Sequence, residues 1–198
     1  MLQFKSAEFY KSISINDQKV FFEKRREVVF VGRSNVGKSS LMNTLFSKKD
    51  LVKTSSKPGK TRLANIFLVD KKYFFTDLPG YWFAKLWKNL KDQLDALISW
   101  YIEERRQYIV KVMILIDARL GPQESDIAMY QYCSELGIPI AIVLNKIDKI
   151  TRNDLWKATQ DLQKIFTGQP IFLVSTLKKQ WIDEIMKYLR ETMNELAK

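Results

Sequence analysis

The segment GRSNVGKS, residues 32–39, follows the apolar run EVVFVG and contains the first residues whose spacing could do chemistry. Its pattern G-x-x-x-x-G-K-S is typical of loops whose backbone amides surround a phosphate chain, with the positive end of the next helix dipole behind them. Lys38 would place its ammonium group between the terminal phosphates, and the Ser39 hydroxyl could bind Mg²⁺. The residues expected to contact phosphate are Gly32, Arg33, Ser34, Asn35, Val36, Gly37, Lys38, Ser39 and Ser40.

The segment DLPG, residues 77–80, ends another apolar run and is the second candidate. Asp77 could hold Mg²⁺ through a water molecule, and the Gly80 amide could reach a γ-phosphate. The same four residues also suit an ordinary turn, so the motif gains its meaning from its place after an expected strand. The nucleotide contacts expected here are Asp77, Leu78, Pro79 and Gly80.

The segment NKID, residues 145–148, follows the apolar run PIAIVL and would select the base. A carboxylate at Asp148 accepts both the N1–H and the exocyclic amine of guanine, whereas adenine presents an acceptor at N1. Lys146 would lie against the base, and Asn145 would tie this loop to the phosphate loop. VST, residues 174–176, could offer amides to the guanine oxygen. The base contacts expected are Asn145, Lys146, Ile147, Asp148, Val174, Ser175 and Thr176.

A basic loop ending in PGKTR supplies the last candidate. Thr61 could complete the coordination of Mg²⁺ when the γ-phosphate is present and withdraw when it is gone, which is an order–disorder switch. The loop contacts expected are Gly59, Lys60, Thr61, Arg62 and Leu63; the metal ligands are Ser39, Thr61 and Asp77; and the catalytic groups are Lys38, Thr61 and Gly80.

Apolar runs of strand length alternate with longer helical patterns, which predicts a doubly wound α/β domain. The expected strands are 27–32, 63–70, 72–77, 111–118, 139–145 and 170–175, and the expected helices are 38–47, 89–106, 123–136, 152–166 and 180–196. Several strands are apolar at every position, as in a mostly parallel sheet covered on both faces. The short KKY connection predicts an antiparallel hairpin. Residues 1–20 form a leader of uncertain structure, and 21–198 form one domain.

The composition limits the possible partners and compartment. The 198 residues carry 33 Lys and Arg against 22 Asp and Glu, a net charge of +11, and no histidine. This excess favours polyanionic partners, nucleic acid before anionic membrane, although it could simply keep the protein soluble. No apolar run is long enough to span a membrane and the N-terminus lacks a signal-peptide core, so we expect a cytoplasmic protein. The single cysteine, Cys133, is expected to be a small core residue on a helix.

The motifs GRSNVGKSSLMN, PGKTR, DLPGYW, NKID and VSTLKKQ together resemble the TRAFAC GTPases, and more narrowly the EngB/YsxC/YihA group of bacterial ribosome-biogenesis GTPases. The resemblance implies a P-loop G domain with six strands and five helices. It also implies GTP binding, slow hydrolysis with Mg²⁺, and a role in late assembly of the large (50S) ribosomal subunit, needed for normal growth, division and septation. The implied partners are precursor particles with their rRNA and ribosomal proteins, and the expected working form is a monomer.

Two other functions stay open at this point. A GTPase acting mainly at the divisome or membrane surface, without direct rRNA contact, would carry the same motifs. An ATP-dependent kinase or transporter subunit is opposed by Asp148.

Some residues depart from the pattern of the group. Trp82 and Trp181 stand where the group commonly has glycine, and each could pack in the core or form a rigid contact for RNA or ribosomal protein. Tyr81 occupies the position where many GTPases carry a Gln that orients the attacking water, which predicts weak hydrolysis by the isolated protein. The missing group could be a K⁺ ion held near Asn35 or a group supplied by the ribosomal particle. Nothing places Arg33 or Arg62 at the γ-phosphate.

Overall fold

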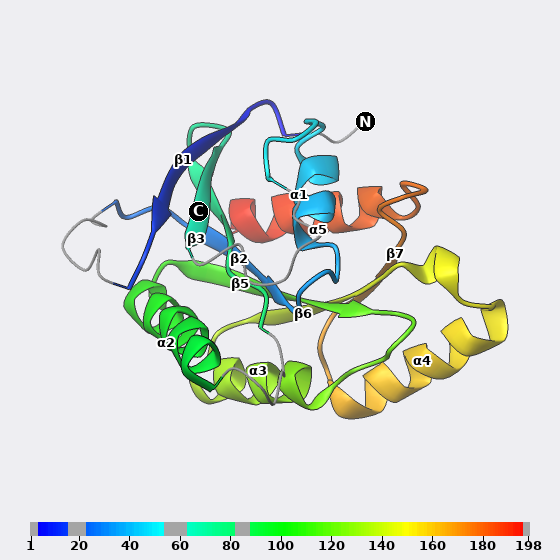
Figure 1. The fold of residues 1–198 in the computed structure, drawn as a ribbon. Coiled ribbons are helices and arrows are strands. Elements are labelled where there is room, and N and C mark those ends of the chain that lie inside the picture. The colour runs from blue at the N-terminus through cyan, green and yellow to red at the C-terminus, as the bar shows by residue number, and fades with distance from the viewer. Residues whose placement is uncertain (1–3, 16–22, 54–62, 82–87, 196–198) are drawn as a thin grey trace.

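The structure is a computed structural model that describes residues 4–15, 23–53, 63–81 and 88–195, and they form a sheet between two layers of helices (Figure 1). The strands are β1 (Ala7–Ile13), β2 (Glu27–Gly32), β3 (Ala64–Val69), β4 (Tyr73–Asp77), β5 (Ile109–Asp117), β6 (Ile140–Asn145) and β7 (Ile171–Val174). The helices are α1 (Lys38–Leu45), α2 (Lys88–Arg105), α3 (Glu124–Glu135), α4 (Arg152–Ile165) and α5 (Ile182–Glu195), with a short 3₁₀ turn, η1 (Ile147–Lys149).

The sheet has the order β1-β3-β4-β2-β5-β6-β7. The five strands from β4 to β7 in this order pair in parallel, whereas β3 pairs antiparallel with β4 and with β1. The doubly wound, mostly parallel α/β domain and the β3–β4 hairpin are therefore confirmed. Strands β2 and β6 are buried at every residue, because helices cover both of their faces.

The sheet contains one more strand than the six implied by the resemblance. The additional strand is β1, which lies within the leader of residues 1–20 and adds to the sheet edge beside β3. Its burial pattern is mixed, and its register shifts between Phe9 and Lys11. Such an irregular, half-exposed edge strand carries a weak periodic signal, which is why the sequence indicated only a leader of uncertain structure here.

Two apolar layers separate the sheet from its helices. One contains buried side chains of α2, α3 and α4, such as Tyr101, Cys133 and Leu162. The other contains buried side chains of α1 and α5, such as Leu41 and Leu189, and Figure 1 shows these two helices on the opposite face of the sheet from the other three. Cys133 is fully buried, as expected, and burial raises the pKa of its thiol to about 12.

A buried polar cluster joins the sheet to α2. Glu27 is 0% exposed and accepts hydrogen bonds from the hydroxyls of Thr76 and Tyr101, both at 2.5 Å. The Nε of Arg105 donates to the same carboxylate at 2.9 Å. Because the carboxylate is paired and hydrogen-bonded, its burial is tolerated, and it anchors the end of α2 against β2 and β4.

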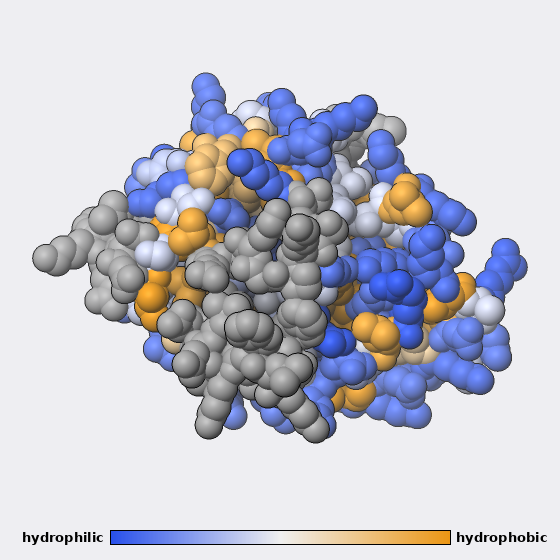
Figure 2. All heavy atoms as spheres, viewed as in Figure 1, coloured by the Kyte–Doolittle hydropathy of each residue, from blue (hydrophilic) through white to orange (hydrophobic). Residues whose placement is uncertain are grey.

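In the part of the chain that the structure describes, no helix has both the length and the apolar character needed to cross a membrane. Polar side chains cover most of the described surface on the face seen in Figure 2, with apolar residues scattered among them.

Candidate nucleotide-binding site

The predicted motifs meet at one edge of the sheet because the parallel strands all end there. Asp77 at the end of β4 pairs with Phe30 of β2, two residues before Gly32. Asp117 at the end of β5 pairs with Asn145 at the end of β6. Ligands of doubly wound sheets bind outside the carboxyl ends of the strands, so this edge is the expected binding site.

The phosphate loop connects β2 to α1 and depends on glycine at residue 37. Gly37 has φ of 104°, and an added Cβ would lie 2.4 Å from the Asn145 side-chain nitrogen. The backbone conformation and the close approach therefore both require glycine. Helix α1 begins at Lys38, so its N-terminal amides face the space beside the loop. A helix N-terminus in this position favours an anionic ligand.

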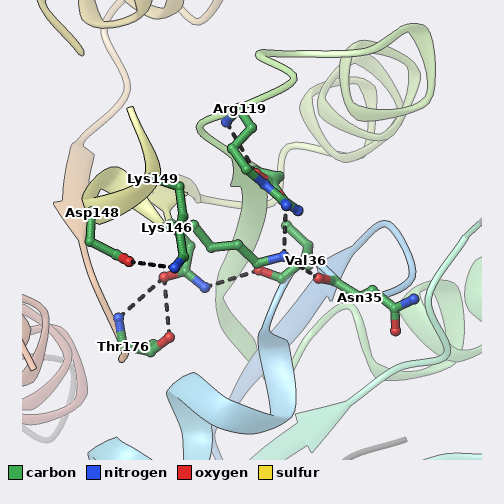
Figure 3. Close-up of polar contacts among 9 residues, drawn as sticks. Asn35, Val36, Arg119, Lys146, Asp148, Lys149 and Thr176 are labelled. Atoms are coloured by element: carbon green, nitrogen blue, oxygen red, sulfur yellow. Dashed lines mark hydrogen bonds and ion pairs between the residues drawn. The ribbon is translucent and has the colours of Figure 1, made fainter. Parts of the chain in front are cut away.

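Asn145 joins three loops from within the protein. Its side-chain NH₂ donates to the Val36 carbonyl at 2.9 Å, which is the predicted link between NKID and the phosphate loop. Its side-chain oxygen accepts from the backbone amide of Thr176 at 3.4 Å and from the Thr176 hydroxyl at 3.3 Å (Figure 3). Asn145 is 0% exposed, so these partners satisfy its polar groups without water. These contacts of Asn145 link the three loops in one arrangement.

Lys146 lies at the centre of a charged cluster that the sequence interpretation missed. Its ammonium donates to the Asn35 carbonyl at 2.6 Å and to Asp117 at 2.8 Å, and Arg119 binds Asp117 through two further hydrogen bonds of 2.9 and 2.6 Å (Figure 3). Burial favours the neutral form of Asp117, but the hydrogen bonds from Arg119 and Lys146 outweigh it and lower the pKa of Asp117 to about 2. Lys146 itself has φ of 65°, a left-handed backbone conformation that the two contacts help to hold. The cluster fixes the direction of the lysine side chain.

Asp148 presents one buried oxygen that has no hydrogen-bond partner among the described residues. Its other oxygen accepts from the Ser175 hydroxyl at 2.6 Å, and Lys149 forms an ion pair of 3.7 Å with the first oxygen without hydrogen-bonding to it. The side chain is only 2% exposed. The bond from Ser175 lowers the pKa of Asp148, partly against burial, so the carboxylate is charged at neutral pH. A buried, ionised and under-satisfied acceptor is suited to two N–H donors of a ligand.

A hydroxyl and a carboxylate converge beside the start of α1. Ser39 Oγ donates to Asp77 Oδ2 at 3.0 Å, and Lys38 Nζ lies 3.7 Å from Asp77 Oδ1, a buried oxygen with no hydrogen bond from the described residues. Asp77 is only 4% exposed, and burial raises its pKa although Lys38 opposes the shift. A hydroxyl and a carboxylate oxygen are donors that fit a hard cation such as Mg²⁺.

The segment after Asp77 lies directly against the phosphate loop. An added Cβ at Gly80 would be 2.9 Å from Ser34 Cα, and the Ser34 amide donates to the Tyr81 carbonyl at 3.3 Å. The Tyr81 side chain is 5% exposed, and its hydroxyl donates to Asp126 of α3 at 2.8 Å. The side chain at the position where many GTPases carry Gln is therefore buried and hydrogen-bonded within the protein. The motif did not predict this contact with Asp126, which is remote in sequence.

The structure places the remaining predicted residues as follows. Leu78, Pro79 and Ile147 are buried beside the site, Ser40 is exposed on α1, and Leu63 is exposed before β3. The predictions for Gly59, Lys60, Thr61, Arg62 and Trp82 lie outside the described residues. Trp181 is 51% exposed, which excludes the core-packing interpretation for this residue.

Comparison with known proteins agrees with this geometry. The family model described as 50S ribosome-binding GTPase matches residues 27–146, and a model of the elongation factor Tu GTP-binding domain matches residues 105–195. The "Probable GTP-binding protein EngB" of Clostridium kluyveri is 39% identical over 196 residues, covering 98% of each chain.

Solved structures show the same relationship. The crystal structure of a probable GTP-binding protein engB matches with a TM-score of 0.72 and 26% identity, covering 85% of this chain and 99% of the other. Era in complex with MgGDPNP and nucleotides of 16S ribosomal RNA matches with a TM-score of 0.68 and 27% identity, covering 85% of this chain and 56% of the other. The chain belongs to the EngB family of GTP-binding P-loop GTPases.

Proposed function

We propose that the protein binds GTP and GDP with Mg²⁺, hydrolyses GTP slowly, and acts in the cytoplasm as a monomeric switch in late assembly of the large ribosomal subunit. Loss of the switch would then impair growth, division and septation. The observation that carries the nucleotide assignment is the buried oxygen of Asp148 that accepts no hydrogen bond from the described residues, beside a phosphate loop that Asn145 holds in place.

The residues of the motifs have defined parts in this proposal. The phosphate-loop amides and Lys38 bind the β- and γ-phosphates, and the Lys146 side chain, held by Asp117, lies along the base. Ser39 and Asp77 would hold Mg²⁺, which neutralises phosphate charge when bound, and Thr61 would join them in the GTP state. Gly80 allows its backbone amide to approach the γ-phosphate past Ser34.

The guanine assignment is tested with Asp148→Asn. An amide presents a donor where guanine needs an acceptor, so affinity for GDP should fall by about a hundredfold or more while affinity for xanthosine diphosphate rises. Asp161→Asn, at an exposed carboxylate of α4, is the matched control and should leave both affinities unchanged. Equal GDP affinity in wild type and Asp148→Asn would refute the assignment.

Hydrolysis needs a group that the described residues do not supply. The Tyr81 hydroxyl is bound to Asp126, so it is not available to orient water. Asn35 is exposed in the phosphate loop, where its backbone carbonyl accepts a hydrogen bond from Lys146. Its side-chain oxygen could join phosphate oxygens in holding K⁺, which would stabilise transition-state charge. Turnover should then be faster in KCl than in NaCl, and Asn35→Ala should remove the difference.

The alternative source of the missing group is the ribosomal particle. In that case turnover rises on addition of large-subunit precursors and is the same in KCl and NaCl. No change under either condition would leave GTP binding in place and contradict slow, activated hydrolysis.

The ribosomal role is supported by family membership and by the net charge of +11, which favours an RNA-rich partner. Co-sedimentation with large-subunit precursors in GTP, GDP and a non-hydrolysable analogue tests it directly, and GTP-dependent binding is expected. Accumulation of incomplete large subunits on depletion is the matching result in cells. Recovery in the membrane fraction with normal ribosome profiles would instead favour the divisome alternative.

A further inference from the structure

Figure 1 shows the loop that joins β7 to α5, residues 175–181, and several of its side chains are exposed beside the nucleotide site. Leu177 is 73% exposed and Trp181 is 51% exposed. Lys178 and Lys179 are exposed between them. Neither lysine forms a salt bridge with an acidic side chain in the described ranges. We call residues 175–181 the β7–α5 loop.

The loop is held in one conformation by its own hydrogen bonds. The backbones of Ser175 and Gln180 exchange two bonds of 3.0 and 3.4 Å, and the Lys178 amide donates to Ser175 Oγ at 3.1 Å. Lys179 and Trp181 have φ of 51° and 56°. A left-handed backbone at a bulky residue is an outlier that persists only where its surroundings impose it, and such strain concentrates at functional positions. The indole is thus presented on a preformed scaffold.

The chemistry of the loop matches single-stranded RNA. An exposed indole offers a flat face on which an unpaired base can stack, and the two adjacent ammonium groups can bind the neighbouring phosphates. Most of the described surface on the face in Figure 2 is hydrophilic, with hydrophobic side chains in several places. A protein partner that buries an apolar interface is less well matched by this surface than a polyanion.

The loop is also connected to the base-binding carboxylate. Ser175 Oγ donates to Asp148 Oδ1 at 2.6 Å while accepting from Lys178. The charge of Lys178 is among the factors that lower the pKa of Asp148. A bound strand would therefore lie next to the guanine end of the site, away from the phosphates and the Mg²⁺ ligands.

We propose that the β7–α5 loop is an RNA-binding site at which Trp181 stacks on an unpaired base and Lys178 and Lys179 bind the adjacent phosphates. This inference rests on the proposed ribosomal function, for which it names the contact chemistry. It assigns a function to the exposed tryptophan and to the basic residues around it.

The first test measures the affinity of the GDP-bound protein for a short fluorescein-labelled single-stranded RNA of mixed sequence by anisotropy. Trp181→Ala should weaken binding by about tenfold or more, as expected for loss of one stacked base, and Trp181→Phe should restore part of it. Trp156→Ala is the matched control, because Trp156 is 64% exposed on α4. It should leave the affinity unchanged, and GDP affinity should be unaltered in all three variants.

The second test uses the lysines. In the double variant Lys178→Ala/Lys179→Ala, the slope of log affinity against log salt should fall in magnitude by about 1.4, the value for two phosphate contacts on a single strand. The control pair Lys157→Ala/Lys164→Ala on α4 removes the same charge elsewhere and should leave the slope unchanged. Equal loss of RNA affinity in both pairs would show a general charge effect and overturn the site.

Co-sedimentation with large-subunit precursors separates failure of this site from failure of the ribosomal function. If wild type does not bind the particles, the ribosomal function is wrong. If wild type and Trp181→Ala bind them equally and also bind the RNA equally, only the RNA site is wrong. If Trp181→Ala loses the particles but keeps full RNA affinity, the loop contacts ribosomal protein, which also overturns the proposed RNA contact.

Discussion

Asn145→Ala should separate the three loops that form the nucleotide site. The substitution removes the 2.9 Å bond to the Val36 carbonyl and the two weaker contacts at 3.3 and 3.4 Å from Thr176. A typical hydrogen bond contributes about 1 kcal/mol, and leaving a buried carbonyl unpaired costs about 1–3 kcal/mol more. The free energy of unfolding should therefore fall by about 2–4 kcal/mol. Because the phosphate loop loses its support, GDP affinity should fall by at least about tenfold, which corresponds to about 1.4 kcal/mol.

The measurement is urea unfolding of nucleotide-free protein, together with titration of a fluorescent GDP analogue. Nucleotide must be removed first, because a ligand that binds only the folded state would mask the loss. Two further variants sharpen the comparison. Thr176→Val removes only the 3.3 Å hydroxyl contact and should cost less than about 1 kcal/mol. Asn145→Asp keeps an acceptor for Thr176 but turns a charged oxygen toward the Val36 carbonyl, so it should destabilise the protein more than Asn145→Ala.

The interpretation of Asn145 would be refuted by a small effect. If Asn145→Ala costs less than about 1 kcal/mol and leaves GDP affinity unchanged, the loops are held by other contacts. If Asn145→Asp is the milder change, the bond to the Val36 carbonyl contributes little.

Three other predictions follow from buried or strained positions. Folding lowers the pKa of Asp117 to about 2, so the charged carboxylate stabilises the protein by about 2 kcal/mol above its unfolded pKa, and this stabilisation disappears as pH falls toward 2. The difference in the free energy of unfolding in urea between wild type and Asp117→Asn should therefore narrow between about pH 5 and 3. A difference that stays constant over this range would contradict the prediction. Glu27→Ala removes the carboxylate that balances the buried charge of Arg105 on α2, so urea unfolding should show a loss of about 3–5 kcal/mol, and Glu27→Gln a smaller loss. Gly37→Ala should weaken GDP binding by at least about tenfold, since its Cβ would lie 2.4 Å from the Asn145 amide. Gly168→Ala is the control, because Gly168 has φ of 76° but nothing lies within 4 Å of the added Cβ. It should lower the free energy of unfolding by only about 1 kcal/mol and leave GDP affinity unchanged.

The nucleotide motifs and the order of the elements could be predicted from the sequence because their signals are local. GRSNVGKS combines a strand end, two glycines and a helix start within a few residues. NKID follows a strand that is apolar at every position, and the structure ends β6 at Asn145 as expected. The alternation of apolar runs with helical patterns predicted a doubly wound sheet, and the topology of such a sheet brings the strand ends together.

Tertiary structure alone decided the contacts that join distant segments. The residues DAR, 117–119, at the end of β5 are a plausible turn in any sequence, and Asp117 reaches Lys146 only because the register pairs Asp117 with Asn145. The contact of Tyr81 with Asp126 likewise depends on how α3 packs against the sheet.

The strand β1 and the exposure of Trp181 also depend on tertiary structure. β1 carries a weak local pattern and becomes a strand because β3 offers a free edge with which it can pair. Trp181 is a residue type that often packs in a core, yet the Ser175–Gln180 bridge holds its backbone so that the indole stays exposed. The sequence by itself determined the motifs and the elements, since these depend on neighbouring residues. The partners of Asp117, Tyr81 and Trp181 depended on strand register and helix packing, which bring together residues far apart in the chain.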